Sequence, residues 1–177
     1  MTVELTPMTV EHLVTVQPWF EDPATRRFLG GPDWPARMLT LAGTAVRTAF
    51  RGAVQTGSHH WIAFQGDQPV GYIDCGTYDR WTVCDGGGDA GPVVRRVIDR
   101  PSAAIALAVD PARRRTGIGR AMLRAVLERE EVCEVQLFAA GVEPDNVASV
   151  RCFEAAGFVR QSVEPDWEDM LYFVRGR

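Results

Sequence analysis

The sequence predicts an α/β or α+β fold, in which helices and strands interleave around a mixed sheet. One reason is that apolar, strand-like runs such as Ala104–Val109 alternate with segments of helical period such as Gly117–Glu130. A second is composition, because 46% of the 177 residues are hydrophobic and 24% are charged, as in ordinary globular proteins. A third is that no internal repeat divides the chain. We therefore expect a single domain over residues 1–177.

The first elements are delimited by prolines and capping residues. A short strand is expected over Val3–Thr6. Thr9 can cap a helix that ends near Pro18, because proline cannot continue a helix. A longer helix is predicted from Pro35 to Phe50, where apolar residues recur at helical spacing.

The following part of the chain predicts a β-hairpin and then a long irregular segment. Strand patterns over His60–Gln65 and Val70–Cys75 flank the turn-forming pair Gly66-Asp67. Between Tyr78 and Arg100 no regular period is present, and we expect a loop there. Beyond it, strands are predicted over Ala104–Val109, Val132–Phe138, Phe158–Gln161 and Met170–Val174, and helices over Gly117–Glu130 and Asn146–Ala156.

Overall charge and composition exclude several classes of function. The net charge of −4 and the absence of a large basic cluster argue against a nucleic-acid binder. The four cysteines are scattered and there are only three histidines, so no metal site is expected. Neither a signal peptide nor a membrane-spanning run is recognisable, and we expect a cytoplasmic protein with reduced cysteines, monomeric or homodimeric.

The segment Val109–Arg120 carries the clearest binding pattern. It runs from an apolar strand through a basic loop and two glycines into an amphipathic helix. The first N–H groups of a helix lack intrahelical partners and lie at the positive end of its dipole, so they can bind a pyrophosphate. Gly117 and Gly119 would let phosphate oxygens approach the backbone, and Arg114 would add positive charge. The pattern is neither a Walker loop nor the dinucleotide fingerprint, because it lacks G-K-[ST] and a third glycine.

Together with residues 143–158, this segment resembles the coenzyme-binding half of the GNAT family of N-acetyltransferases. The matching motifs are Arg114-x-x-Gly117-x-Gly119, Asn146-x-x-Ser149 and Phe153-Glu154-Ala155-Ala156-Gly157-Phe158. The resemblance implies a mixed, mostly antiparallel sheet with splayed middle strands, flanked by helices. It also implies acetyl-CoA as co-substrate, an acceptor-binding half over about residues 1–100 and a coenzyme-binding half over about residues 101–177.

The resemblance assigns coenzyme-binding residues by position. The strand before the loop would pair with the pantetheine arm, the loop and the helix start would bind the pyrophosphate, and the next helix would contact the arm. These residues are Leu107, Ala108, Val109, Arg114, Arg115, Thr116, Gly117, Ile118, Gly119, Arg120, Asn146, Ser149 and Phe153. Asn146 is also a good helix N-cap in any protein.

The sequence departs from the family pattern at the position of the usual acid. Many family members have a tyrosine where Phe153 stands, and its phenol protonates the departing thiolate. Phenylalanine cannot donate a proton. Ser149 and Tyr72 remain candidate replacements, and a water molecule is a further possibility.

The general base is likewise not at its usual place. The family often has a glutamate early in the strand that begins here with Ser102. We predict Asp74 as the substitute, because it shares one face of its strand with Tyr72 by the two-residue alternation. A solvated surface charge is the alternative interpretation of Asp74. The other candidate carboxylates are Asp79, Asp85 and Asp99.

The N-terminal half is rich in tryptophan and aspartate, which together suit a cationic acceptor. We expect at least two of these tryptophans, Trp19, Trp34, Trp61 and Trp81, to be structural. The layout is similar to that of aminoglycoside and ribosomal-protein acetyltransferases. The predicted acceptor is therefore a primary amine of a small cationic metabolite or an aminoglycoside-like antibiotic. Acetylation of a protein N-terminus or lysine, and a non-catalytic acetyl-CoA-binding module, are the alternatives.

Overall fold

The structure, a computed structural model, describes residues 2–42, 49–86 and 92–177. The strands are β1 Glu4–Pro7, β2 Ala49–Phe50, β3 Ala53–Gln65, β4 Gln68–Tyr78, β5 Trp81–Asp85, β6 Val93–Ile98, β7 Ser102–Val109, β8 Leu137–Val142, β9 Val159–Arg160 and β10 Leu171–Gly176. The α-helices are α1 Leu13–Val16, α2 Pro23–Leu29, α3 Asp33–Leu41, α4 Ile118–Leu127 and α5 Val147–Ala155.

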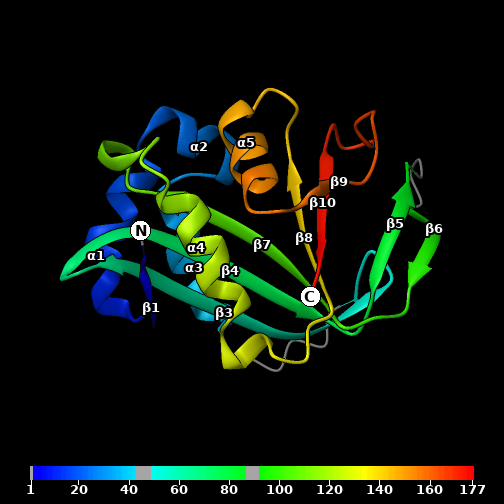
Figure 1. Cartoon of the computed structure of the whole chain (residues 1–177), viewed down its shortest axis with the longest axis horizontal. Helices are drawn as coiled ribbons and strands as arrows, with labels where there is room; N and C mark the ends of the chain where they lie inside the picture. The colour runs from blue at the N-terminus through cyan, green and yellow to red at the C-terminus, as the bar shows by residue number, and fades with distance from the viewer. Residues whose placement is uncertain (1, 43–48, 87–91) are drawn as a thin grey trace.

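One twisted sheet forms the centre of the molecule, with strand order β1-β3-β4-β7-β8-β10-β9 and β2 beside β3 (Figure 1). All of its neighbouring strands pair antiparallel except β7 and β8, which run parallel. Strands β5 and β6 form a separate antiparallel hairpin. The predicted fold class, a mixed and mostly antiparallel sheet flanked by helices, is confirmed.

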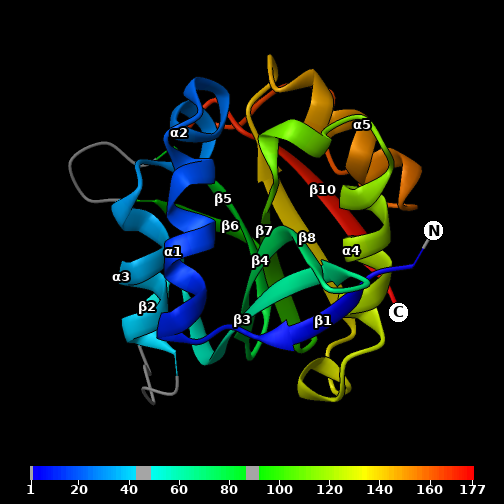
Figure 2. The same ribbon diagram turned by 90° about the vertical axis from the view of Figure 1, so that its left-hand side faces the viewer.

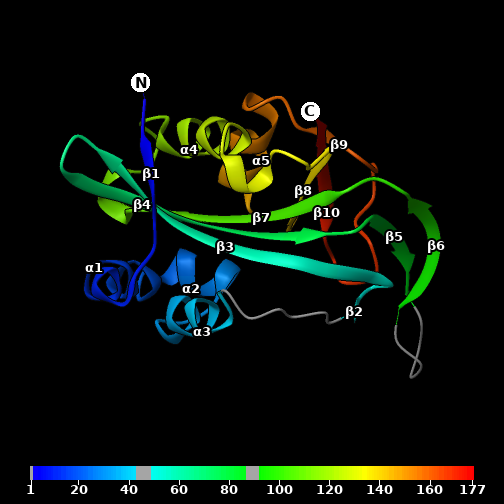
Figure 3. The ribbon, with the colours of Figure 1, turned by 90° about the horizontal axis from the view of Figure 1, so that it is seen from below.

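Helices cover both faces of this sheet. Figure 3 shows α4 and α5 on one face and α1, α2 and α3 on the other. The first face buries a large core in which Met122 of α4 and Phe153 of α5 pack with Ile73 of β4. On the second face, Phe20 and Tyr72 belong to a smaller core. None of the described helices is long and apolar enough to cross a bilayer.

The sequence prediction was wrong at the end of the third helix. The predicted helix over Pro35–Phe50 begins at Asp33 and ends at Leu41, and Phe50 lies in β2. Gly43, Thr44 and Val46, which follow in the sequence, are poor helix formers and lie outside the described residues.

Two further predictions need correction. The segment predicted as a loop between Tyr78 and Arg100 contains the hairpin β5–β6, while residues 87–91 of its glycine-rich part lie outside the described residues. The strand predicted over Val132–Phe138 begins only at Leu137, because Glu130–Val132 forms a 3₁₀ turn that closes α4. Helix α2 was not predicted, although Asp22 followed by Pro23 is a regular helix start.

Candidate active site

The parallel strands β7 and β8 separate after a short contact. Their pairing is limited to Ser102–Ala104 with Leu137–Ala139, and beyond Ala104 the strands diverge (Figure 1). On its other side, β7 stays paired with β4 along its whole length. The edge of β7 that faces β8 therefore leaves backbone groups of residues 105–109 available to an extended ligand.

The N-terminus of α4 lies directly after this open strand. Its N-cap is Gly117, in the left-handed region at φ 88°, and no side chain caps the helix. The preceding loop is held by Asp110, whose carboxylate accepts a hydrogen bond from the N–H of Ala112 at 3.0 Å. The first N–H groups of α4 lack intrahelical partners, a feature that favours the binding of an anion at the end of the open strand.

The two glycines of the motif, Gly117 and Gly119, differ in what surrounds the position of a Cβ atom. A Cβ atom at Gly117 would enter open space, with no other atom within 4 Å. A Cβ atom at Gly119 would lie 2.9 Å from Sγ of Cys152 and 3.5 Å from Val109. Gly119 is therefore favoured by the close packing of α4 against Cys152 and Val109, while close approach of phosphate oxygens stays a prediction. Of these two glycines, only Gly117 borders open space.

Arg114 is engaged in a contact that differs from its predicted one. Its guanidinium donates hydrogen bonds of 2.6 Å both to the carboxylate of Asp22 and to the hydroxyl of Thr25, at the start of α2. Burial by itself would raise the pKa of Asp22, but the hydrogen bonds from Arg114 and Thr25 outweigh it and lower that pKa. Arg114 thus connects α2 to the loop before α4. Figure 2 shows α2 and α4 in the two separate helical layers that this contact joins. Arg115 and Thr116 are the exposed polar residues of the loop.

The second motif starts α5, as its sequence predicts. Asn146 is the N-cap, and its side-chain oxygen accepts a hydrogen bond of 3.2 Å from the N–H of Ser149. The neighbouring Asp145 forms an ion pair with Arg27 of α2. Helix α2 is therefore connected to the loops before α4 and before α5 alike.

Phe153 lies in the main core. Its side chain is only 4% exposed, and its ring packs edge-on against Phe158 at 5.1 Å and roughly parallel to Phe173 at 6.4 Å between ring centres. Phe153 therefore has a packing role that needs no ligand.

The substitution Phe153→Tyr is expected to raise kcat and to add a fall in rate at alkaline pH, where a phenol ionises, if protonation of the leaving thiolate limits the reaction. Phe158→Tyr adds the same hydroxyl to the same aromatic cluster and should leave the pH–rate profile unchanged. Initial rates from pH 6 to 10 measure both variants. Identical profiles for Phe153→Tyr and the wild type would mean that thiolate protonation is not limiting.

Asp74 lies in a polar cluster on the face of the sheet that carries α1, α2 and α3. Its carboxylate is 3.2 Å from Nδ1 of His60, which is directly opposite on β3. The hydroxyl of Tyr72 lies 2.9 Å from the same nitrogen, and the hydroxyl of Ser58 lies 2.9 Å from Nε2. An ionised Asp74 favours the tautomer with the proton on Nδ1, with Ser58 donating to Nε2.

Burial determines the protonation states in this cluster. It raises the pKa of Asp74 to about 7, against a smaller lowering by a hydrogen bond from the N–H of Cys75. Burial also lowers the pKa of His60 to about 4, helped by the charge of His59, so His60 is neutral at physiological pH. The side chain of Asp74 is 19% exposed and that of His60 only 1%, so the carboxylate is the group that a ligand can reach.

The environment of Tyr72 does not suit its predicted role as the acid that protonates the thiolate. Its side chain is completely buried, T-shaped against Phe20 and Trp34, and burial together with the charge of Asp74 raises its pKa. A fully buried phenol bonded to His60 is poorly placed to protonate a leaving thiolate. We therefore assign Tyr72 to positioning His60, and Ser149, half-buried at the start of α5, remains the other predicted candidate.

The alternative carboxylates do not share this environment. Asp79 accepts hydrogen bonds from the N–H of Val54 and from Arg80, which lower its pKa. Asp85 is exposed and lies 3.4 Å from Arg95, and Asp99 is exposed. Among the predicted carboxylates, only Asp74 combines burial with access.

His60 was not predicted as a functional residue, because in the sequence it only begins the predicted strand His60–Gln65. The signal that could have found it is the strand register. Counting from the Gly66-Asp67 turn places Ile73 opposite His60, but a bulge at Val70 shifts the pairing by one residue and brings Asp74 there.

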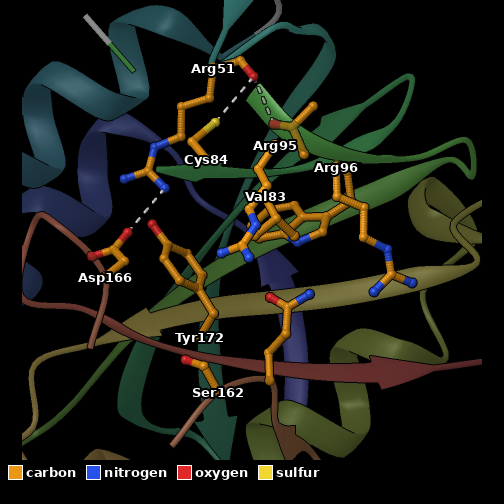
Figure 4. A pocket seen from close by; sticks show the side chains of 11 residues that line it. Arg51, Val83, Cys84, Arg95, Arg96, Ser162, Asp166 and Tyr172 are labelled. Atoms are coloured by element: carbon orange, nitrogen blue, oxygen red, sulfur yellow. Dashed lines mark hydrogen bonds and ion pairs between the residues drawn. The ribbon is translucent and has the colours of Figure 1, made fainter. Parts of the chain in front are cut away.

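A cavity of about 530 Å³ lies beside the hairpin β5–β6 (Figure 4), and we call it the hairpin cavity. Its lining comes from both halves of the chain, and consists of Arg51, Trp81, Thr82, Val83, Cys84, Arg95, Arg96, Gln161, Ser162, Asp166 and Tyr172. Of the four tryptophans of the N-terminal half, only Trp81 lines it. Trp19 and Trp61 are buried in the cores, as expected for at least two of the four.

The hairpin cavity and Asp74 share one face of the sheet. Trp81 packs in a cluster with Ala104 of β7. Ala106, two residues further along β7, is the register partner of Asp74. Side chains two residues apart point to the same face, so Ala104, beside Trp81, and Ala106, beside Asp74, lie on one face about 7 Å apart along β7.

Metal chemistry has no candidate residues in the part of the chain that the structure describes. No group of three or more histidine, cysteine, aspartate or glutamate side chains is arranged there to hold an ion. All four cysteines are free.

The site thus combines an open strand that leads to a helix N-terminus with a reachable carboxylate on the neighbouring strand. Residues 15–158 match the model of the acetyltransferase (GNAT) family, and the chain belongs to this family. The predictions of the family and of an acyltransferase enzyme are confirmed.

Relatives with known sequences and structures agree with this assignment. An uncharacterized N-acetyltransferase of Bacillus subtilis, YfmK, is 27% identical over 169 residues, covering 94% of this chain and 92% of that protein. A mycothiol acetyltransferase of Geodermatophilus obscurus is 31% identical over 110 residues, which are 60% of this chain but 30% of that protein. Among solved structures, aminoglycoside acetyltransferase AAC(6')-Ib in complex with coenzyme A and kanamycin superimposes with a TM-score of 0.71 at 20% identity, covering 99% of this chain and 95% of that one.

Proposed function

We propose that this protein transfers the acetyl group of acetyl-CoA to a primary amine of a small molecule, by direct attack within a ternary complex. The observation that carries the proposal is the position of Asp74. Its register partner Ala106 lies on β7 just beyond Ala104, the last residue that pairs with β8. The carboxylate therefore lies one strand away from the open edge of β7, along which the pantetheine arm would lie.

The coenzyme would be held by backbone groups more than by side chains. Leu107, Ala108 and Val109 would pair with the arm, and the N–H groups of Ile118, Gly119 and Arg120 would bind the pyrophosphate, with the exposed Arg115 adding charge. The solved complex of AAC(6')-Ib with coenzyme A and kanamycin supports acetyl-CoA and a small amine as the two substrates.

In the proposed reaction the amine nitrogen attacks the thioester carbonyl, a C–N bond forms and the C–S bond breaks. Asp74 takes the proton that the amine loses, directly or through a water molecule. A base with a pKa of about 7 suits this step, because it is substantially ionised at neutral pH and still accepts a proton readily. His60 orients the carboxylate, and the thiolate takes its proton from Ser149 or from water.

The domain organisation is part of the same proposal. A single domain would place the coenzyme on about residues 101–177 and the acceptor mainly on about residues 1–100. The hairpin cavity modifies this division, because Gln161, Ser162, Asp166 and Tyr172 also line it. We place the reaction in the cytoplasm, where the free cysteines would stay reduced.

Release of free coenzyme A thiol, measured with a panel of amines, tests the proposal directly. We expect turnover of acetyl-CoA that depends on the added amine, and an acetylated product detected by mass spectrometry. Acetyl-CoA binding without turnover of any small amine would contradict the proposal. It would favour protein acetylation, if a peptide amine is then modified, or a regulatory coenzyme-binding module, if none is.

A further inference from the structure

The lining of the hairpin cavity has more arginines than carboxylates, and two of these arginines also pair with carboxylates beside the cavity, Arg51 with Glu168 and Arg95 with Asp85. Three arginines, Arg51, Arg95 and Arg96, line it against one carboxylate among the described residues, Asp166. An acceptor with many ammonium groups would meet repulsion in such a cavity, whereas an acidic group would be attracted.

The carboxylate of Asp166 is already in use. One of its oxygens accepts hydrogen bonds from the N–H groups of Glu168 and Met170, at 2.9 and 3.0 Å. Its other oxygen lies 3.7 Å from the guanidinium of Arg51, which also forms an ion pair with Glu168 (Figure 4). Asp166 therefore holds the turn before β10 against Arg51, while its Oδ2 atom, 3.7 Å from the Arg51 guanidinium, has no hydrogen-bond partner among the described residues.

The other two arginines are presented to the cavity by a β-bulge. Val83 pairs with Arg96 and Cys84 with Val94, so Arg95 is the extra residue on β6. A bulge breaks the two-residue alternation, which explains how two consecutive side chains can line one cavity. Both arginines are exposed, and the contact of Arg95 with Asp85 joins side chains that are 71% and 59% exposed, so it is easily exchanged for a ligand.

Trp81 supplies an independent sign of a missing acceptor atom. It is 6% exposed and lines the cavity, yet its indole N–H has no hydrogen-bond partner among the described residues. A buried donor without a partner is unfavourable, and an oxygen atom of an acidic ligand would satisfy it.

We propose that the acceptor carries an acidic group in addition to its amine, and that Arg95, Arg96 and the indole N–H of Trp81 bind this group in the hairpin cavity. The inference rests on the proposed function, since it assumes that the amine meets Asp74. Trp81 clusters with Ala104, which lies two residues, about 7 Å, along β7 from Ala106, the register partner of Asp74. The proposal takes the acceptor to be a small amino acid or an amine phosphate that reaches from Asp74 to Trp81. The acceptor class is therefore a small anionic amine and not a polycation such as an aminoglycoside.

Matched pairs of amines that differ only in the acidic group test this assignment. L-Lysine is compared with cadaverine and O-phosphoethanolamine with ethanolamine, with kanamycin as the polycationic reference, by thiol release at saturating acetyl-CoA. We expect the acidic member of at least one pair to have the higher kcat/KM by roughly tenfold or more. The pair that responds distinguishes a carboxylate from a phosphate.

The double variant Arg95→Gln/Arg96→Gln should raise the KM of the acidic amine roughly tenfold or more. The KM of the matched amine that lacks the acidic group should stay nearly unchanged. Arg124→Gln, an exposed arginine of α4 that does not line the hairpin cavity, is the matched control. Preference for the member without the acidic group in both pairs, a higher kcat/KM for kanamycin than for either acidic amine, or an unchanged ratio in the double variant would refute the anionic acceptor while the proposed function stands. Turnover of no amine at all would count against both.

Discussion

Replacing Asp74 with asparagine is expected to lower kcat about a hundredfold, the usual contribution of a general base, and to leave the affinity for acetyl-CoA unchanged. Asparagine keeps the size of the side chain and can still bond to His60, but it cannot accept the proton of the amine. Asp67→Asn, an exposed carboxylate in the turn of the same hairpin, is the control and should retain wild-type rates. A wild-type kcat for Asp74→Asn at saturating amine would remove Asp74 from the mechanism.

The pH dependence gives this experiment a second readout. Below its pKa of about 7 Asp74 holds a proton and cannot act as a base, so kcat/KM should rise with pH through about 7 and level off above it. The Asp74→Asn variant should lack this rise. A wild-type profile with no inflection between pH 6 and 8 would contradict the assignment.

As the pH rises through 7, the contribution of Asp74 to the free energy of unfolding should fall while the activity rises. In the unfolded chain Asp74 ionises near pH 3.9, whereas in the folded protein burial raises its pKa to about 7. Between these values the folded state holds a proton that the unfolded state has lost, so this residue makes the free energy of unfolding fall as pH rises. Asp74→Asn should therefore have a higher Tm than the wild type at pH 8 and a similar Tm at pH 4. A lower Tm at pH 8 would mean that ionised Asp74 is stabilised by its neighbours.

The sequence predicted the segment from Val109 to Leu127 and the start of α5 well because their signals are local. A strand, a glycine-containing loop and an amphipathic helix follow one another between Val109 and Leu127, and Asn146 caps the next helix with its own side chain. Propensity and capping act over a few residues, so one sequence is enough to locate such elements.

The acceptor side could not be predicted because it depends on long-range contacts. A bulge at Val70 is needed to bring His60 opposite Asp74. A second bulge, in β6, is needed for Arg95 and Arg96 to line the same cavity. The hairpin cavity brings Arg51 together with Asp166, which are far apart in the chain. Neither bulge has a distinct local pattern, and Arg114 shows the same limit, since its charge suggested a phosphate partner while the fold places Asp22 beside it.

The variant Gly117→Val is expected to weaken acetyl-CoA binding roughly tenfold to a hundredfold, the loss of one or two charge-assisted hydrogen bonds, as measured by calorimetry. Gly117 is in the left-handed region at φ 88°, and its Cβ position faces open space at the start of α4. A branched side chain there would either fill the space needed by the pyrophosphate or turn the first N–H groups of the helix away from it. Gly119→Val would be a poorer test, because its Cβ lies 2.9 Å from Sγ of Cys152 and would disturb the core first.

Gly66→Val is the matched control for this experiment. Gly66 also has a positive φ, 59°, and open space at its Cβ position, but it lies in the turn between β3 and β4. Both substitutions should lower Tm by a similar amount, since each forces a branched residue into the left-handed region at a cost of about 1–2 kcal/mol. Only Gly117→Val should weaken coenzyme binding. Equal affinities for acetyl-CoA in the two variants would place the pyrophosphate elsewhere than at the N-terminus of α4.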